Sequence, residues 1–349
     1  MNNNNKIPIL GLLPHELKTM LSPLPSFRVD QIYHWIRRGI SSFNAMNNLP
    51  ENLRDDLEKR FTLRSSEITR CFESKDASLK LQIKLSDGLF IESLVLQDQF
   101  ERKTACLSTQ LGCPMACVFC KTGSMGFFRN LSAAEIVEQF FHLKENRAEI
   151  SNIVFMGMGE PLLNLGELRQ AIAVLTADDG KESFSKRRIT ISTCGIIKGI
   201  YDLAENGPAV RLAISITTAD EALRQKLMPA AAENPLAELK KALHYYQGKQ
   251  GKRITLEAVL LGGLNTRPED IRSLIDFSKG LDVLINLIPW NAVEGLQFQG
   301  HTLYEPKSLE IRDFAAGLEN AGLKTVRRSS RGRAVGGACG QLGGESSLP

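Results

Sequence analysis

The sequence has no long apolar run, few cysteines and little net charge. The first two shortages each argue against a class of protein, and the third leaves one class open. No apolar stretch of membrane-spanning length occurs, and no basic N-terminal segment precedes an apolar one, so we expect neither a membrane anchor nor a secretory signal. Seven cysteines, an odd number and clustered, argue against a secreted disulfide framework and for a reducing, cytoplasmic location. A net charge of +4 permits nucleic-acid binding without indicating it.

The chain does contain three cysteines within eight positions, Cys113, Cys117 and Cys120. The spacing CxxxCxxC can hold three irons of a [4Fe-4S] cluster and leaves the fourth iron open. A structural zinc site needs four protein ligands, and neither a fourth cysteine nor a histidine lies within twenty residues downstream. Three inert buried thiols are the remaining alternative, but packing alone poorly explains such a concentration. An open cluster is therefore the favoured interpretation.

The length of 349 residues is enough for about two domains, and 43% hydrophobic against 23% charged residues is an ordinary globular balance. Residues 1–12 begin with a polar, low-complexity asparagine run, which predicts a disordered N-terminus. Residues 13–66 have helical periodicity, with Val29 and Ile36 on one helix face. We expect a small helical domain there.

Basic residues in this helical domain suggest an accessory RNA-binding surface. They are Arg37, Arg38, Arg54, Lys59, Arg60 and Arg64. The alternative is packing and a solvated face without a partner, which is what most runs of charge are.

Residues 67–98 are expected to form a β-hairpin linker, because apolar residues between 79 and 97 alternate around the turn signal 86–88. Residues 99–333 then alternate between short apolar runs and helical segments, which predicts βαβ units around a parallel sheet. The expected strands are 153–156, 189–192, 210–216, 254–261, 283–288 and 324–327, with one more near 104–108. Six or seven strands are fewer than the eight of a closed barrel, so the expected α/β fold is a partial, open (βα)6-type barrel.

Polar and glycine-rich residues follow several of these strands at their carboxyl ends, where such folds build their sites. Between the cysteine loop and the strand at 153–156, Ser132 and Glu135 form a capping box. The capping box predicts a helix that runs to about Asn146.

Four motifs make the chain similar to a known family. The cysteine loop, with Phe119 before its last cysteine, resembles the cluster loop of radical S-adenosylmethionine (SAM) enzymes. The stretches GMGEPLLN (157–164), INLIPWN (285–291) and ACGQL (338–342) narrow the resemblance to the RlmN family of RNA adenine methyltransferases. This resemblance runs from about residue 13 almost to the C-terminus.

The resemblance implies a radical SAM core on residues 99–333 and methylation of carbon 2 of an adenosine in 23S rRNA and in tRNA. It implies that Cys113, Cys117 and Cys120 hold a [4Fe-4S] cluster, whose open iron binds SAM through the amino and carboxylate groups. It also implies two SAM molecules per turnover and an electron donor such as flavodoxin. We further expect a monomer.

The resemblance also assigns three residues to the chemistry. Cys339 corresponds to the thiol that accepts a methyl group from one SAM. Cys106 corresponds to the resolving thiol, which forms a disulfide with Cys339 and releases the methylated base. Glu92 corresponds to the acceptor of the carbon 2 proton, with a solvated hairpin carboxylate as the alternative. Because glycines surround Cys339 and exclude a regular helix or strand, residues 334–349 are expected to be a flexible tail.

Matching of the same kind predicts contacts to SAM near strand ends, at Gly159, Glu160, Ser192, Ser215, Ile216, Thr217 and Asn291. For the glycine turn at 157–160 the alternative is a tight strand-to-helix connection without a ligand. The family usually has Ser-Leu-His at 215–217, so the contact at Thr217 persists only if backbone atoms make it.

Five basic residues and no acid precede the reactive thiol: Lys324, Arg327, Arg328, Arg331 and Arg333. Such a run would attract RNA phosphate, and the target adenine must be unstacked or flipped to reach the thiol. The family commonly has acidic residues where this chain has 333–337. Cys71 and Cys194 match no chemical role, and we interpret both as packing residues.

Two rival functions remain open at this point. One is the Cfr-type activity at carbon 8 of adenine, although the Gly-Glu-Pro-Leu and Ile-Pro-Trp-Asn stretches favour the RlmN type. The other is a cluster-bearing protein without turnover that binds RNA or senses redox conditions, an alternative supported by the departures at Thr217 and before Cys339.

Overall fold

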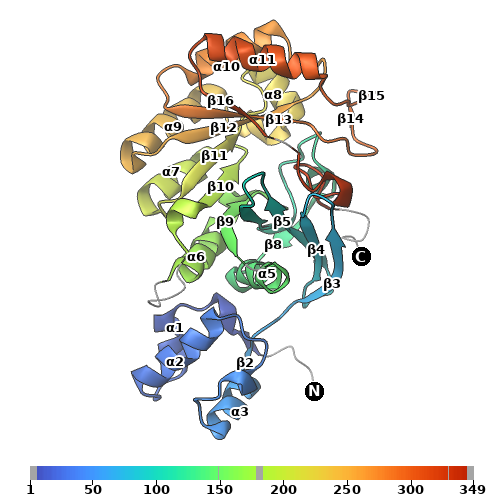
Figure 1. The fold of residues 1–349 in the computed structure, drawn as a ribbon. Coiled ribbons are helices and arrows are strands. Elements are labelled where there is room, and N and C mark those ends of the chain that lie inside the picture. The colour runs from blue at the N-terminus through green and yellow to red at the C-terminus, as the bar shows by residue number, and fades with distance from the viewer. Residues whose placement is uncertain (1–5, 148, 178–183, 329, 344–349) are drawn as a thin grey trace.

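The computed structural model describes residues 6–147, 149–177, 184–328 and 330–343. A helical unit comes first and consists of α1 (Pro14–Met20), α2 (Ser26–Arg37) and α3 (Glu51–Arg60). It lies at one end of the molecule, apart from the main sheet (Figure 1). The short strands β1 (Ile7–Pro8) and β2 (Phe61–Thr62) pair in parallel and bring the beginning and end of this unit together.

Helix α2 forms where apolar residues recur at helical spacing, and Val29, Ile32 and Ile36 are buried on its inner face. The predicted disorder of residues 1–12 is wrong for part of that stretch. Residues 7–11 form β1 and the 3-10 turn η2 (Ile9–Gly11), because the apolar side chains there are buried. Residues 1–5 lie outside the described residues.

Among the described residues, the main sheet has ten strands, and seven neighbouring ones run parallel to each other. These are β6 (Lys103–Cys106), β9 (Ile150–Phe155), β10 (Ile189–Thr193), β11 (Arg211–Ser215), β12 (Ile254–Leu260), β13 (Val283–Pro289) and β16 (Thr325–Arg327). Each lies within two to three residues of a predicted strand. Within the described ranges the edge strands do not pair with each other, so the α/β sheet is open, as predicted.

Helices connect the parallel strands. They are α5 (Ala133–Asn146), α6 (Leu165–Thr176), α7 (Ile197–Asn206), α8 (Glu221–Leu227), α9 (Leu236–Gln250), α10 (Pro268–Ser278) and α11 (Ser308–Asn320). The predicted capping box begins α5, since Ser132 accepts from the backbone of Glu135 while the Glu135 side chain accepts from Ser132. Figure 1 shows α6, α7 and α9 along one side of the sheet. Among the described residues, no helix is both long and apolar enough to cross a bilayer.

Three antiparallel strands extend the sheet beyond β6. They are β3 (Glu67–Glu73), β4 (Leu79–Lys84) and β5 (Phe90–Gln97). The hairpin of β4 and β5 confirms the predicted alternation, while β3 was not predicted. Because β5 pairs with β6, the segment is part of the main sheet as well as a connection to the helical unit.

The chain end folds back onto this antiparallel extension. After the 3-10 turn η7 (Arg333–Val335) the backbone makes turns up to Gly343, with no regular helix or strand around Cys339, as predicted. The expectation of a flexible tail does not describe residues 334–343, because they are held by hydrogen bonds such as Lys121 N to Gly340 O at 2.8 Å. Residues 344–349 lie outside the described residues.

Candidate active site

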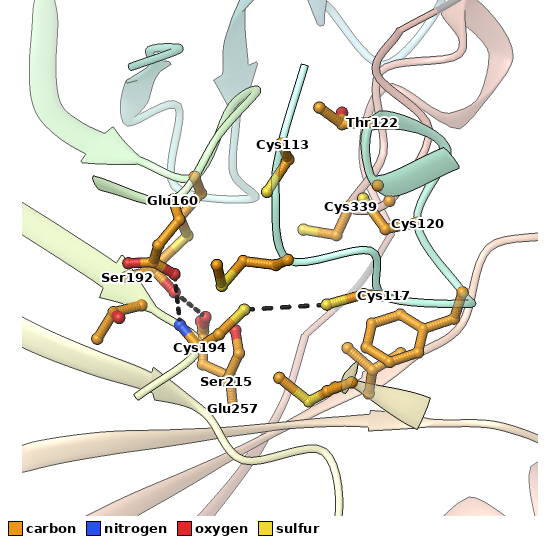
Figure 2. Close-up of a pocket in the computed structure, with 18 of the residues that line it drawn as sticks. Cys113, Cys117, Cys120, Thr122, Glu160, Ser192, Cys194, Ser215, Glu257 and Cys339 are labelled. Atoms are coloured by element: carbon orange, nitrogen blue, oxygen red, sulfur yellow. Dashed lines mark hydrogen bonds between the residues drawn. The ribbon is translucent and has the colours of Figure 1, made fainter. Parts of the chain in front are cut away.

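A cavity opens at the carboxyl ends of the parallel strands β9 to β13, the edge at which α/β folds build their sites. Its empty volume is about 910 Å³, part of it open to solvent. The predicted site residues that line it are Cys113, Cys117, Cys120, Gly159, Glu160, Ser192, Ser215 and Cys339. Figure 2 shows the cysteine loop across the cavity from Glu160 and Ser192.

The cysteine loop is shaped by its own backbone. Cys113 N donates to the carbonyl of Gly126 at 2.8 Å, and Cys120 N donates to the carbonyl of Cys117 at 3.1 Å. Ala116 has a φ of +50°, which turns the chain sharply between the first two cysteines. Gly123 approaches so closely that a Cβ there would lie 2.9 Å from the backbone N of Cys117. The loop therefore has a fixed path around the cavity.

Three thiols around one cavity suit a [4Fe-4S] cluster better than a single metal ion. Among the described residues, no three His, Cys, Asp or Glu side chains converge closely enough for one ion, whereas a four-iron cluster binds each thiolate through a separate iron. Burial raises the pKa of the Cys113 and Cys120 thiols. Iron binding compensates, because a coordinated thiol is deprotonated. The residues present fit this cofactor.

The turn at residues 157–160, which follows β9, forms part of the cavity wall. Gly159 has a φ of +101°, and a Cβ there would lie 2.5 Å from Cβ of Gln110, so only glycine fits. The Glu160 carboxylate accepts backbone N–H groups of Leu162 at 3.0 Å and Cys194 at 2.8 Å. Burial raises the pKa of Glu160 despite these bonds. The segment is thus a tight turn and a cavity wall at once.

Ser192 at the end of β10 is held by a buried carboxylate. Its hydroxyl donates to Glu257 Oε2 at 2.9 Å, and Asn286 Nδ2 donates to Glu257 Oε1 at 3.3 Å. The sequence analysis missed Glu257. Its signal was a lone acid within the apolar run 254–260, because carboxylates are seldom buried without a partner or a task.

The residues at 215–217 have different surroundings. Ser215 lines the cavity, and Ile216 is fully buried in the apolar core. Thr217 is buried with a φ of +56°, and its backbone N donates to the carbonyl of Glu257 at 3.1 Å. Its hydroxyl is buried and has no hydrogen-bond partner among the described residues.

Asn291 lies beside Cys339 in a neighbouring cavity. Its Nδ2 donates to the carbonyl of Cys339 at 3.4 Å, and both residues line a cavity shared with Arg328. The preceding Trp290 donates its Nε1 to the carbonyl of Phe119 at 2.8 Å. The end of β13 is therefore fastened both to the tail and to the cysteine loop.

The structure brings Cys106 and Cys339 to one cavity, which Cys120 and Arg328 also line. Burial, reinforced by Cys339, raises the pKa of Cys106 to about 12, and Arg328 opposes that rise. The pKa of Arg328 is raised in turn, chiefly by Cys339. The sequence analysis gave Arg328 only a role in attracting RNA, but its guanidinium is close enough to act on both thiols.

Glu92 is buried on β5, so the alternative of a solvated carboxylate is wrong. Its Oε1 lies 2.9 Å from Lys80 Nζ, and its Oε2 accepts the backbone N–H of Gly343 at 2.8 Å. Both oxygens therefore have partners beside the tail. Ile216, Thr217 and Glu92 do not line the main cavity.

The packing interpretation is wrong for Cys71 and holds only in part for Cys194, which packs against a buried apolar cluster that includes Met115 and Trp290. Cys71 is exposed on β3, an edge strand with one face toward solvent. Cys194 follows β10 and lines the main cavity, with its Sγ 3.9 Å from Cys117 Sγ (Figure 2).

Two of the basic residues predicted to form an RNA-binding surface on the helical unit, Arg37 and Arg64, have partners within the protein. Arg37 is buried and donates to the carbonyls of Val174 and Leu175, so it fastens α2 to the core. Arg64 pairs with Glu145 at 2.5 Å across the same junction. These two arginines hold the helical unit in place and are not free for RNA.

The basic residue where the family commonly has acids also has a partner. Arg333 pairs with Glu305, whose Oε1 accepts from Ala292 N at 3.2 Å. A side chain at Gly337 would collide with Leu94 of β5. The departure from the family pattern thus coincides with a tail that is packed against β5 and tied to the loop after β13.

Comparisons with known proteins agree with this site. Sequence profiles of the Radical SAM superfamily and of the ribosomal RNA large subunit methyltransferase N-terminal domain match residues 107–277 and 9–63, respectively. A probable dual-specificity RNA methyltransferase RlmN from Treponema denticola is 50% identical over 97% of this chain and 96% of its own length. Its namesake from Thermus thermophilus is 42% identical over 96% of this chain and 92% of its own length.

A solved structure extends the agreement to the fold. The crystal structure of a radical SAM methyltransferase from Sphaerobacter thermophilus matches with a TM-score of 0.91 at 34% sequence identity, covering 96% of this chain and 99% of that one. The likeness therefore extends over nearly the whole chain. With relatives this similar over nearly their whole length, this chain belongs to the RlmN family of the radical SAM superfamily.

Proposed function

We propose that this protein methylates carbon 2 of a specific adenosine in 23S rRNA and in tRNAs, with Cys339 as methyl carrier and Cys106 as resolving thiol. The observation that carries the proposal is the cavity shared by Cys339, Cys106 and Cys120, next to the cavity of the cysteine loop. The names of the relatives support an RNA methyltransferase of dual specificity.

Membership of the superfamily implies a [4Fe-4S] cluster and SAM. Cys113, Cys117 and Cys120 would hold the cluster, and two SAM molecules per turnover would supply the methyl group and a 5'-deoxyadenosyl radical. For SAM, Gly159, Glu160, Ser192 and Ser215 offer backbone and polar groups on the opposite cavity wall. Thr217, also proposed as a SAM contact, is buried and does not line this cavity, so its contact would require a local rearrangement.

The need for a carrier thiol follows from the substrate. Carbon 2 of adenine is electrophilic and cannot attack a methyl group, so the carbon is first attached to Cys339 and then joined to the base. The resulting thioether links protein and RNA and must be broken. Cys106 does this by forming a disulfide with Cys339, while Glu92 takes the proton from carbon 2.

The structural neighbourhood of each residue suits its role. Burial, reinforced by neighbouring Cys339, raises the pKa of Cys106 to about 12, so this thiol is protonated near neutral pH. Arg328 lies beside both thiols, and its charge opposes the rise in the pKa of Cys106. Glu92 contacts the backbone of Gly343, so a movement of the tail changes its surroundings directly.

Similarity to RlmN proteins over nearly the full length favours carbon 2 over the Cfr-type carbon 8 activity, and the thiol pair argues against a non-catalytic sensor. We further propose that the protein is a cytoplasmic monomer that receives electrons from a flavodoxin-type donor.

The test uses anaerobically reconstituted protein with SAM, a reductant and an unmodified rRNA fragment, followed by digestion and chromatography of nucleosides. We expect 2-methyladenosine from the wild type and none from Cys339→Ala. Cys106→Ala is expected to retain a covalent RNA adduct on the peptide that contains Cys339. Cys71→Ala is the control, because this thiol is exposed and distant from the cavity. Formation of 8-methyladenosine instead would refute the carbon 2 assignment.

A further inference from the structure

Among the described cysteines that line the main cavity, Cys194 alone has no role in the proposed reaction. It follows β10 and lines the main cavity, and its Sγ lies 3.9 Å from Cys117 Sγ, within hydrogen-bond reach for sulfur. Figure 2 shows the two side chains directed at each other across the cavity. The residues are 77 apart in sequence, so only the fold brings them together.

The backbone of Cys194 is fixed from both sides. Its N–H donates to Glu160 Oε2 at 2.8 Å, and its carbonyl accepts from Arg224 Nη2 at 2.6 Å. Arg224 is itself fully buried, and Gly195 follows with a φ of +96°. A thiol on so constrained a backbone has few positions available, and the one it occupies is against Cys117.

The sulfur atom of each cysteine in the loop has its own hydrogen-bond donor. The N–H of Met115 donates to Cys113, and the N–H groups of Thr122 and Gly123 donate to Cys120. For Cys117 the hydrogen-bonding neighbour is the thiol of Cys194. When Cys117 ligates iron as a thiolate it has no proton to give, so Cys194 must be the donor.

The Glu160 carboxylate is a second acceptor within reach of the Cys194 thiol. Its two oxygens already accept the backbone N–H groups of Leu162 and Cys194. An iron-bound thiolate shares the negative charge of its cluster and is the less satisfied of the two acceptors. This difference directs the thiol proton to Cys117.

We propose that the Cys194 thiol donates a hydrogen bond to the Cys117 sulfur and thereby raises the reduction potential of the cluster. Hydrogen bonds to cluster sulfurs stabilise the reduced form, because that form carries one more negative charge. The thiol acts through Cys117 and is a positioning and tuning residue. The inference depends on the proposed function in one respect, namely that Cys117 is a cluster ligand.

The test is a potentiometric titration of the full-length, anaerobically reconstituted protein, followed by electron paramagnetic resonance of the reduced cluster. Cys194→Ala removes the donor, and Cys194→Val removes it while filling most of the space. In both variants we expect the ratio of reduced to oxidised cluster at a fixed applied potential to fall about threefold, the effect of one weak hydrogen bond. Cys194→Ser keeps a donor and is expected to fall between these variants and the wild type.

A second readout detects the proton itself. In deuterated buffer the reduced wild-type cluster should show a coupling to an exchangeable deuteron that is absent from both Cys194→Ala and Cys194→Val. Cys71→Ala is the matched control and should equal the wild type in both measurements, since Cys71 is an exposed thiol outside the cavity. If the Ala and Val variants keep the wild-type potential and coupling, the hydrogen bond to Cys117 does not exist.

Failure of the inference is distinguishable from failure of the proposed function. Iron and sulfide analysis of Cys117→Ala shows whether Cys117 holds the cluster at all, and full retention there would overturn the proposed ligand set. Wild-type protein with a normal cluster, together with unchanged potentials in the Cys194 variants, overturns only the inference. Should Cys194→Ala not retain its cluster, the comparison of Cys194→Val with Cys194→Ser decides the question.

Discussion

At the scale of single residues, the two thiols of the proposed reaction, Cys106 and Cys339, differ in how far they are shielded from solvent. Cys106 is buried, and burial raises its pKa to about 12. Near pH 8 only about one molecule in ten thousand then carries the thiolate. We expect iodoacetamide to modify Cys106 far more slowly than exposed Cys71, with a rate that rises about tenfold per pH unit up to the pKa. Peptide mass spectrometry over a pH series measures both rates, and equal rates near pH 8 would contradict the assignment.

The same scale shows what single residues in a sequence can and cannot reveal. The cysteine loop and Cys339 were identified from spacing and motif, because those signals are local. The position of Cys194 in the cavity was missed because its contact with Cys117 joins distant segments. Glu257 stood out only as an acid in an apolar strand, and nothing local indicated that it accepts from Ser192.

At the scale of elements, the buried ion pair between β4 and β5 is expected to stabilise the sheet extension under the tail. Lys80 and Glu92 are almost inaccessible, with side-chain exposures of 10% and 2%. Lys80→Met leaves a buried carboxylate without its cation, and we expect a loss of about 3–5 kcal/mol in the free energy of unfolding.

The control for this prediction lies on the same strand. Lys84 pairs with Glu67 at 3.4 Å, with side-chain exposures of 42% and 67%. Lys84→Met should therefore cost less than about 1 kcal/mol, because exposed pairs are worth little. Urea unfolding followed by circular dichroism measures both variants, and similar losses would show that burial of the Lys80–Glu92 pair does not matter.

The junction between the helical unit and α5 should weaken in acid. Burial, with help from Arg64, lowers the pKa of His142 to about 4 from an ordinary 6.5, and Ser66 Oγ lies 3.0 Å from its Nε2. Between those two values the unfolded chain takes up a proton that the folded protein refuses. The stability contributed by neutral His142 is therefore present above the unfolded pKa and falls by up to about 3 kcal/mol as the pH drops to 4.

His142→Gln is the variant that isolates this effect, since it keeps a hydrogen-bonding side chain and cannot titrate. Nearby Glu138 has a pKa raised by burial, which favours the folded state in acid, but it is present in both proteins and cancels in the comparison. Urea unfolding near neutral pH and at about pH 4.5 should show a larger loss for the wild type than for His142→Gln. An equal loss would mean that His142 takes its proton in the folded state.

Helices and strands could be predicted from the sequence where a single pattern of apolar residues dominates the segment. The parallel strands are apolar, β-branched runs, and they were found within a few residues. Strand β3 was missed because its side chains are mostly polar and exposed, so it pairs as an edge with little apolar alternation to mark it. The packed tail was missed because hydrogen bonds to Glu92, Lys121 and Thr122 hold it, and these residues come from distant parts of the chain.

At the scale of the whole molecule, RNA binding should depend on the exposed arginines and not on the buried ones. Arg327 is exposed beside the tail, whereas Arg37 is buried between α2 and α6. Arg327→Ala is expected to reduce the slope of log affinity against log salt by about one, the effect of one phosphate contact. Arg37→Ala should leave the slope unchanged and lower stability. Filter binding across a salt series measures the slopes, and a reduced slope for Arg37→Ala would contradict this division.

The open sheet has a consequence for how a large substrate reaches the chemistry. Side chains of β5 and β6 and the segment after β16 line one common cavity, and the tail with Cys339 occupies the space between them. A closed barrel would have a continuous wall there and would admit ligands only through its mouth. Cys339, the proposed methyl carrier, belongs to the segment that occupies this gap, so any displacement of that segment would move the thiol and open the gap together. We therefore expect a base of a folded RNA to approach from this side of the sheet.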